Sequence, residues 1–277
     1  MQSFIANVVI IVGFAAAGGW LATKTTEVLA GRTLPLAAMV AVSGVLAFWV
    51  FHVVFGAVAI LLSLCLAWAL LALAVIDWLE FRLPELLTLP LIAAGLIGSA
   101  FLPGRDILDD VTLPPILFLA AESPFHVGSA AVQALMQVTA HSIAAAAAYL
   151  TLSLIAWSYH LLRGREGMGT GDPTLAAAAG AWLGLETLPS VLFLASVTGF
   201  VWALVAGLFG GREPLSQRIP FGVPLSLAIW TVWLYGESLS VNWVIPVALV
   251  ALLAWLHPQE TEQRSSADDG ATDPPHN

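Results

Sequence analysis

The sequence predicts an all-α, polytopic helical membrane protein with about eight or nine transmembrane helices. Hydrophobic residues make up 59% of the 277 residues and charged residues only 10%, so most of the chain has no polar face to show to water. Several apolar runs also approach or exceed the ~20 residues with which a helix spans a hydrocarbon core. The single cysteine, Cys65, excludes an internal disulfide and a Cys-x-x-Cys zinc site.

Nine helices are expected from the positions where these apolar runs begin and end. The first is interpreted as a retained helix, because no basic segment precedes it and no convincing cleavage site follows it. A polar link at 23–33 follows it, and a long connector covers 103 to about 137. The expected helices lie near residues 4–22, 34–52, 55–77, 85–102, 138–162, 173–184, 190–209, 221–235 and 241–256.

Two regions are predicted along the chain. Residues 1–257 form one membrane-embedded domain. Residues 258–277 are polar, contain proline and nearly lack large apolar side chains, so they are expected to be a disordered tail. The net charge of −9 indicates little about partners, because the acids gather in the long connector and in this tail.

The basic residues predict the orientation in the membrane. With nine crossings, eight of the nine Lys and Arg residues fall on one side, and Arg105 alone falls on the other. The positive-inside rule makes the eight-residue side cytoplasmic. Those residues are Lys24, Arg32, Arg82, Arg163, Arg165, Arg212, Arg218 and Arg264.

The segment 166–175 contains a carboxylate that glycines bring to the start of a helix. Pro173 suits a first helical position, where its missing N–H has no helical partner. Asp172 could simply cap that helix by accepting from free backbone N–H groups. An ionisable group at the end of a membrane helix nevertheless costs free energy, so it is by default a candidate functional residue. The glycines stand at every second position before it: Gly167, Gly169 and Gly171.

Asp77 is the second unusual acid, and it is expected to close the third helix. A carboxylate is disfavoured there by the helix dipole. The alternative is that Asp77 only marks where the helix leaves the bilayer. Asp77 and Asp172 are both placed at the cytoplasmic face, and if they converge they would share a proton. One could then activate a water while the other polarises a carbonyl, as in aspartic proteases.

Other chemistries have less support in the sequence. It contains no His-Glu-x-x-His, no Gly-x-Ser-x-Gly and no phosphate loop, and we expect no metal, no cofactor and no nucleic-acid partner. His141 and His160 are isolated and are expected to be packed or interfacial. Gly180 and Gly184, with Ala176 before them, form a stripe of small residues that permits close contact between helices.

Three segments resemble the type IV prepilin leader peptidases, which carry a Gly-x-Gly-Asp motif. One is Gly-Met-Gly-Thr-Gly-Asp, ending at Asp172, followed by Gly-Ala-Trp-Leu-Gly184. Another is Ala-Val-Ile-Asp77, followed by Arg-Leu-Pro-Glu-Leu-Leu-Thr-Leu-Pro-Leu91. The third, Ile-Pro-Phe-Gly222, is similar to a later Pro-Phe-Gly element. The resemblance covers about Leu70 to Trp230, and all three segments stand in the family's order.

The resemblance implies a membrane aspartic endopeptidase with Asp77 and Asp172 as its catalytic pair. It would cut the basic leader of prepilins or pseudopilins of type IV pili or type II secretion. The cut would fall at the cytoplasmic face of the bacterial inner membrane. The implied partners are the substrate helix and membrane lipid. The alternatives are a presenilin-like protease of other transmembrane helices and a non-catalytic assembly or transport component.

Several features depart from the family's pattern. Thr174 stands where lysine is usual, Glu85 where aspartate is usual, and Val223 where proline is usual. Bifunctional members carry a Cys-rich cytoplasmic domain with N-methyltransferase activity, whereas this sequence has the short link 23–33 in the corresponding place. We therefore expect leader cleavage without N-methylation.

Overall fold

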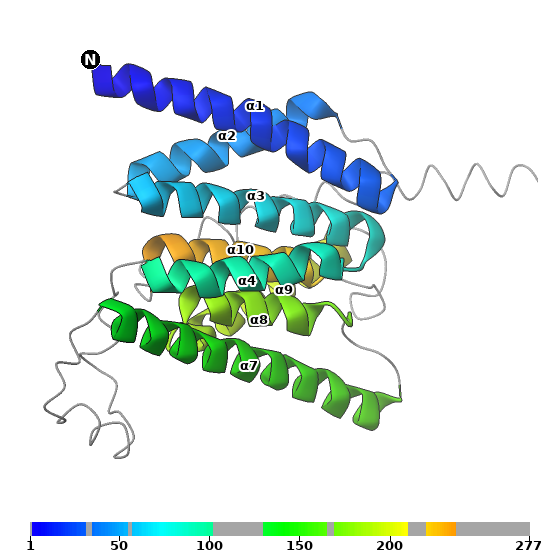
Figure 1. Cartoon of the computed structure of the whole chain (residues 1–277). Coiled ribbons are helices and arrows are strands. Elements are labelled where there is room, and N and C mark those ends of the chain that lie inside the picture. The colour runs from blue at the N-terminus through cyan, green and yellow to red at the C-terminus, as the bar shows by residue number, and fades with distance from the viewer. Residues whose placement is uncertain are drawn as a thin grey trace, which may run out of the picture.

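The computed structural model describes residues 2–31, 35–54, 57–101, 130–164, 169–209 and 220–236, and these form a bundle of eight helices (Figure 1). They are α1 (Gln2–Ala30), α2 (Leu36–Val53), α3 (Ala57–Glu80), α4 (Glu85–Phe101), α7 (Ala130–Arg163), α8 (Asp172–Leu183), α9 (Leu188–Phe209) and α10 (Gly222–Tyr235). The expected helix at 241–256 and the tail at 258–277 lie outside the described residues.

Four of these helices are long and apolar enough to cross a membrane, which confirms the predicted class of helical membrane protein. The spans are Leu36–Val53, Val58–Glu80, Val132–Arg163 and Leu188–Val205. Two shorter apolar helices, α4 and α10, pack among them. Large apolar side chains remain exposed along the outer faces, for example Phe193 and Phe200 on α9. Lipid is the solvent that such faces suit.

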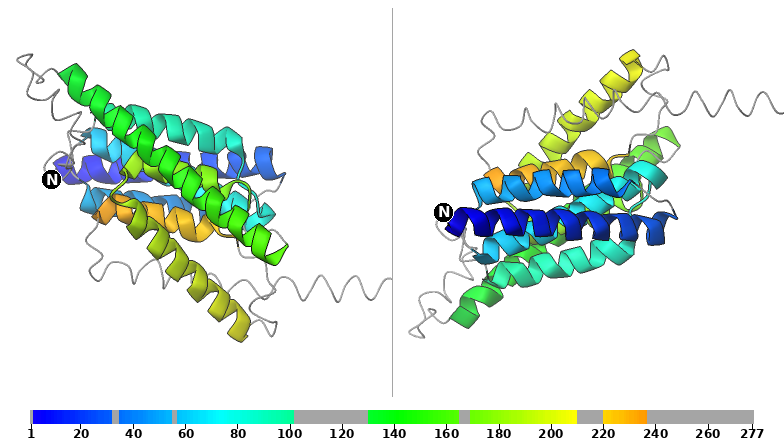
Figure 2. Two further views of the ribbon diagram at one scale, coloured as in Figure 1. Left: turned by 90° about the horizontal axis from the view of Figure 1, so that it is seen from below. Right: turned by 90° about the horizontal axis from the view of Figure 1, so that it is seen from above.

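The short helix α8 lies inside the bundle. It packs against α4, α7, α9 and α10, and its residues from Leu175 to Leu183 are buried. In Figure 1, α1 and α2 lie at one side, α3 comes next, and α7 covers the opposite side. Seen from above or below, α9 leaves the bundle at an oblique angle (Figure 2). The core therefore forms around α3, α8 and α10.

One end of the bundle gathers the helix termini that carry the two singled-out acids. The end of α3 and the starts of α4, α8 and α10 lie together at the right of Figure 1. The turn between α8 and α9 lies at the opposite end. Because the helices alternate in direction, segments far apart in the sequence meet at this end.

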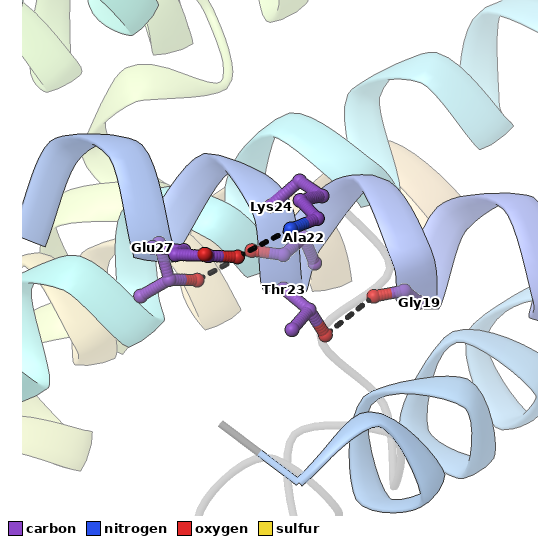
Figure 3. Close-up of polar contacts among 6 residues, drawn as sticks. Gly19, Ala22, Thr23, Lys24 and Glu27 are labelled. Carbon is purple, nitrogen blue, oxygen red and sulfur yellow. Dashed lines mark hydrogen bonds and ion pairs between the residues drawn. The ribbon is translucent and has the colours of Figure 1, made fainter. Parts of the chain in front are cut away.

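The polar link expected at 23–33 is mostly helical, so this boundary was wrong. The hydroxyls of Thr23 and Thr26 each donate to the backbone carbonyl four residues earlier, which satisfies them without leaving the helix (Figure 3). Lys24 Nζ also lies 2.6 Å from Glu27 Oε2, an ion pair on one exposed helix face. These local interactions let α1 continue past its apolar run.

Two other boundaries also differ from the expectation. α3 continues for three residues beyond Asp77, and α7 begins at Ala130 instead of near Val138. The added turns of α7 fall in the expected connector, at 130–137, where alanine, leucine, methionine and glutamine favour helix. The rest of that connector, including the short apolar run at 113–121, lies outside the described residues.

Candidate active site

Asp77 lies within the last turn of α3 and is only 4% exposed. The helix ends just after it, because Phe81 adopts a left-handed conformation with φ of 54°. The N–H of Phe81 donates to the carbonyl oxygen of Asp77 at 2.8 Å. Asp77 thus belongs to the helix and does not terminate it as expected. Its carboxyl group is kept inside the bundle.

The first turn of α10 is in direct contact with the Asp77 carboxyl group. A β-carbon at Gly222 would lie 2.7 Å from Asp77 Oδ2 and 2.9 Å from Cγ, so only glycine permits this approach. The N–H groups of Gly222 and Val223 lie beside the carboxyl group, although Oδ2 lacks a hydrogen bond of ordinary geometry among the described residues. The positive end of α10 thereby opposes the unfavourable dipole at the end of α3.

Asp172 is the first residue of α8 and is 3% exposed. Its Oδ2 accepts a hydrogen bond from the backbone N–H of Gly169 at 3.0 Å, so the side chain turns back toward the glycine segment. The helix is capped by Gly171 without a side-chain hydrogen bond. The alternative interpretation of Asp172 as a capping residue is therefore wrong, and Pro173 takes the second helical position.

The glycines of this segment have separate roles. A β-carbon at Gly171 would lie 2.6 Å from Leu83 Cβ, so glycine lets the start of α8 approach the turn between α3 and α4. A β-carbon at Gly169 would lie 3.3 Å from Asp172 Oδ2. Gly167 lies outside the described residues. At Gly171, the glycine that brings the carboxylate to the start of α8 is also required by packing.

The two acids interact electrostatically. Burial, and after it the negative charge of Asp77, raise the pKa of Asp172 from its usual value of 3.8 to about 7, although the hydrogen bond from the Gly169 N–H acts to lower this pKa. Asp172 lies outside the four long apolar spans. Two neighbouring carboxyl groups that cannot both ionise cheaply retain a proton near neutral pH. The arrangement can thus supply one proton donor and one proton acceptor.

Close backbone packing holds α8 in place. A β-carbon at Gly180 would lie 2.5 Å from the backbone of Ala144 on α7, so the expected contact through small residues is confirmed at this position. On the other side, Gly95 of α4 leaves room for the Trp182 indole. Trp182 Nε1 donates to the carbonyl oxygen of Leu91 at 2.8 Å. The helix that carries Asp172 is therefore fixed between α4 and α7.

The remaining titratable groups are separate from this pair. His141 is buried and its Nδ1 lies 2.9 Å from the carbonyl oxygen of Ala181, which confirms the packed role expected for it. Glu80 forms an ion pair with Arg82 at 3.0 Å, and Glu85 is exposed. No group of three or more His, Cys, Asp and Glu residues that could hold a metal ion occurs in the described ranges.

Sequence reasoning did not count Gly222 among the site residues, although the structure places it against Asp77. The sequence signal that could have identified Gly222 is the Pro-Phe-Gly segment, which the sequence analysis used only for its resemblance to the peptidase family. Nothing in the composition or periodicity of α10 distinguishes this glycine. Its importance comes from a contact between residues far apart in the sequence.

A profile of the type IV leader peptidase family matches residues 64–204, which contain both acids and half of the chain. The chain belongs to the type IV leader peptidase family. Among curated relatives, the prepilin leader peptidase/N-methyltransferase of Aeromonas salmonicida is 35% identical over 189 residues, which are 68% of this chain and 54% of the relative. No solved structure matches the chain.

Other members of the type IV leader peptidase family give a consistent picture. The protein of the same name from Pseudomonas aeruginosa is 30% identical over 232 residues, 83% of this chain and 67% of the relative. That from Burkholderia pseudomallei is 38% identical over 167 residues, 60% of this chain and 43% of the relative. The chain spans about half the length of the first curated relatives it matches.

Proposed function

We propose that this protein is a membrane aspartic endopeptidase that removes the leader from prepilins or pseudopilins, with Asp77 and Asp172 as its catalytic pair. The observation that carries the proposal is the pair itself. Two buried carboxyl groups, from segments almost a hundred positions apart, act on each other electrostatically at one end of the bundle. Membership of the family gives the reaction class, and the names of the relatives give the substrate class.

The chemistry follows from the shared proton. The ionised carboxylate takes a proton from a water molecule, whose oxygen attacks the carbonyl carbon of the scissile peptide bond. The protonated carboxyl group donates to the carbonyl oxygen, which stabilises the tetrahedral intermediate. When the C–N bond breaks, the amine takes up a proton. The products are the leader with a new carboxylate and the mature pilin with a new amine.

The placement of the pair suits a substrate with a charged leader and an apolar helix. The Lys and Arg residues of the described ranges are Lys24, Arg82 and Arg163, which belong to the final turns of α1, the α3–α4 turn and the end of α7. These parts of the helices lie at the same end of the bundle as the end of α3 and the start of α8 (Figure 1). By the positive-inside rule this end faces the cytoplasm of a bacterial inner membrane. A leader cut there, just before a membrane helix, belongs to type IV pilus or type II secretion pathways.

Cleavage of a purified prepilin in detergent tests the proposal. We expect two products whose masses add up to the substrate plus one water. In ¹⁸O-labelled water the heavy oxygen should enter the leader's new carboxylate and not the mature protein. Absence of cleavage for prepilins and pseudopilins encoded beside this protein would contradict the proposal. A protein with Glu80→Gln, which alters a partly exposed acid that pairs with Arg82 at the same end, is the control and should cleave normally.

A further inference from the structure

Three buried polar atoms without a hydrogen-bond partner belong to Asp77 and to α10, the helix whose first turn contacts Asp77. In the described part of the chain, five buried side-chain atoms lack a hydrogen-bond partner. Two belong to Ser43 and Trp68, and the other three are Asp77 Oδ2, Ser226 Oγ and Trp230 Nε1. Because buried polar groups are almost always satisfied by protein or by ordered water, this group requires an explanation.

Ser226 and Trp230 continue the face of α10 that begins at Gly222. Residues four apart in a helix lie above one another on the same face. Further along this face, Trp233 Nε1 donates to Ser63 Oγ on α3 at 2.7 Å. Ser226 and Trp230 are each 3% exposed, so neither lipid nor bulk solvent reaches their side chains. The face is therefore turned into the interior beside α3, the helix that carries the first acid.

The helical spacing of Gly222, Ser226 and Trp230 and the polarity of the three atoms fit water. Four helical residues rise by about 6 Å, and one water with two hydrogen bonds of about 2.8 Å each covers that distance. The Trp230 indole can only donate, the Ser226 hydroxyl can donate and accept, and the ionised Asp77 carboxylate can only accept. A row of water molecules between them would satisfy every group. Polar cavities hold such water, whereas apolar ones stay dry.

We propose that Ser226 and Trp230 bind internal water beside Asp77 and that this water replenishes the molecule consumed in each hydrolysis. The proposal rests on the proposed peptidase function. Each cleavage uses one water, whose oxygen bonds to the carbonyl carbon as the C–N bond breaks. A substrate helix docked at this end of the bundle would shield the acids from bulk solvent. Water molecules held within the bundle would replace the one consumed in each cleavage.

Hydroxyl-radical footprinting of the purified protein tests the water site without relying on cleavage. The matched internal reference is Trp182, which is 4% exposed and whose Nε1 is already bonded to Leu91. Radicals form from water beside a side chain, so we expect Trp230 to be oxidised several-fold faster than Trp182. Ser226→Ala should slow oxidation of Trp230. Equal oxidation of the two tryptophans would overturn the proposal.

Turnover measurements test the supply of water. Ser226→Ala should lower kcat by at least about fivefold with KM unchanged, since Ser226 is buried and does not reach the surface on which a substrate would dock. Ser226→Thr keeps the hydroxyl and should retain most of the rate. Thr231→Val is the control on α10, because Thr231 Oγ1 is buried but already bonded to Leu227 O at 2.8 Å.

The two measurements separate the possible failures. A Ser226→Ala protein with the wild-type kcat would overturn the proposed water supply. If the wild-type protein cleaves no prepilin, the proposed function fails, while the footprinting comparison still decides whether water is bound beside Asp77.

Discussion

The α-carbon of Gly222 lies against the carboxyl group of Asp77. A β-carbon at this position would stand 2.7 Å from Oδ2 and 2.9 Å from Cγ of Asp77, closer than side chains tolerate. The contact joins the end of α3 to the start of α10, two helices separated by about half of the chain. It explains in physical terms why a Pro-Phe-Gly segment belongs to a site built around two acids.

Gly222→Ala should therefore reduce leader cleavage by at least about tenfold, because the acid or the helix must shift by a fraction of an ångström. Cleavage at matched protein levels is the measurement. Gly199→Ala is the control, since a β-carbon there meets its nearest neighbour, Pro224 Cγ, at an ordinary 3.8 Å. Equal activity of the two variants would show that the contact with Asp77 is unimportant.

Gly180→Ala should destabilise the protein by about 1–3 kcal/mol, because the added methyl group overlaps the backbone of α7. Its β-carbon would lie 2.5 Å from Ala144. Gly98→Ala provides the comparison, with nothing nearer than 3.8 Å to the new β-carbon. Thermal unfolding in detergent measures both. A Gly180→Ala protein as stable as Gly98→Ala would argue against tight packing of α8 on α7.

Stability should depend on pH through Asp172. Its pKa is raised in the folded protein from 3.8 to about 7. The stabilisation by its protonated form is therefore complete below the unfolded value and lost as pH rises through about 7. We expect the unfolding temperature to fall from about pH 5 to about pH 8, and Asp172→Asn to flatten this dependence. An unchanged slope in the variant would assign the effect to other groups.

Orientation can be tested with single cysteines in a Cys65→Ala background. Arg82→Cys lies in the turn between α3 and α4, and Glu186→Cys lies in the turn between α8 and α9, at the opposite end (Figure 1). Both native residues are exposed. On intact cells an impermeant thiol reagent should label position 186 and not position 82. The reverse pattern would place the two acids at the outer face.

The helical class and the approximate positions of the eight described helices could be predicted from the sequence, and both acids could be singled out as candidates, because apolar runs and isolated charges are local features. Boundaries were less accurate where local polar interactions extend a helix. α1 passes through Thr23 and Thr26 because each hydroxyl bonds to its own helix. Phe81 ends α3 although phenylalanine is not a helix-breaking residue, and its left-handed conformation is set by the surrounding fold.

The details of the site depend on contacts between distant segments, which spacing cannot reveal. Spacing alone allows Asp172 to cap α8, whereas in the structure its carboxylate accepts a hydrogen bond from the N–H of Gly169. The approach of Gly171 to Leu83, and of Gly222 to Asp77, needs the packing of α8 and α10 against α3 and α4. A glycine in a sequence indicates only freedom of the backbone, and the structure identifies the neighbour that requires it.

The most direct test of the account is cleavage of a prepilin by proteins with Asp77→Asn, Asp172→Asn or both. Each change preserves side-chain volume and removes the shared proton chemistry. We expect either single variant to be expressed and folded like the wild type yet to lose leader cleavage, and the double variant to be no worse, because the pair acts as a unit. Substantial processing by a well-folded Asp77→Asn or Asp172→Asn protein would contradict the assignment of these two acids as the catalytic pair.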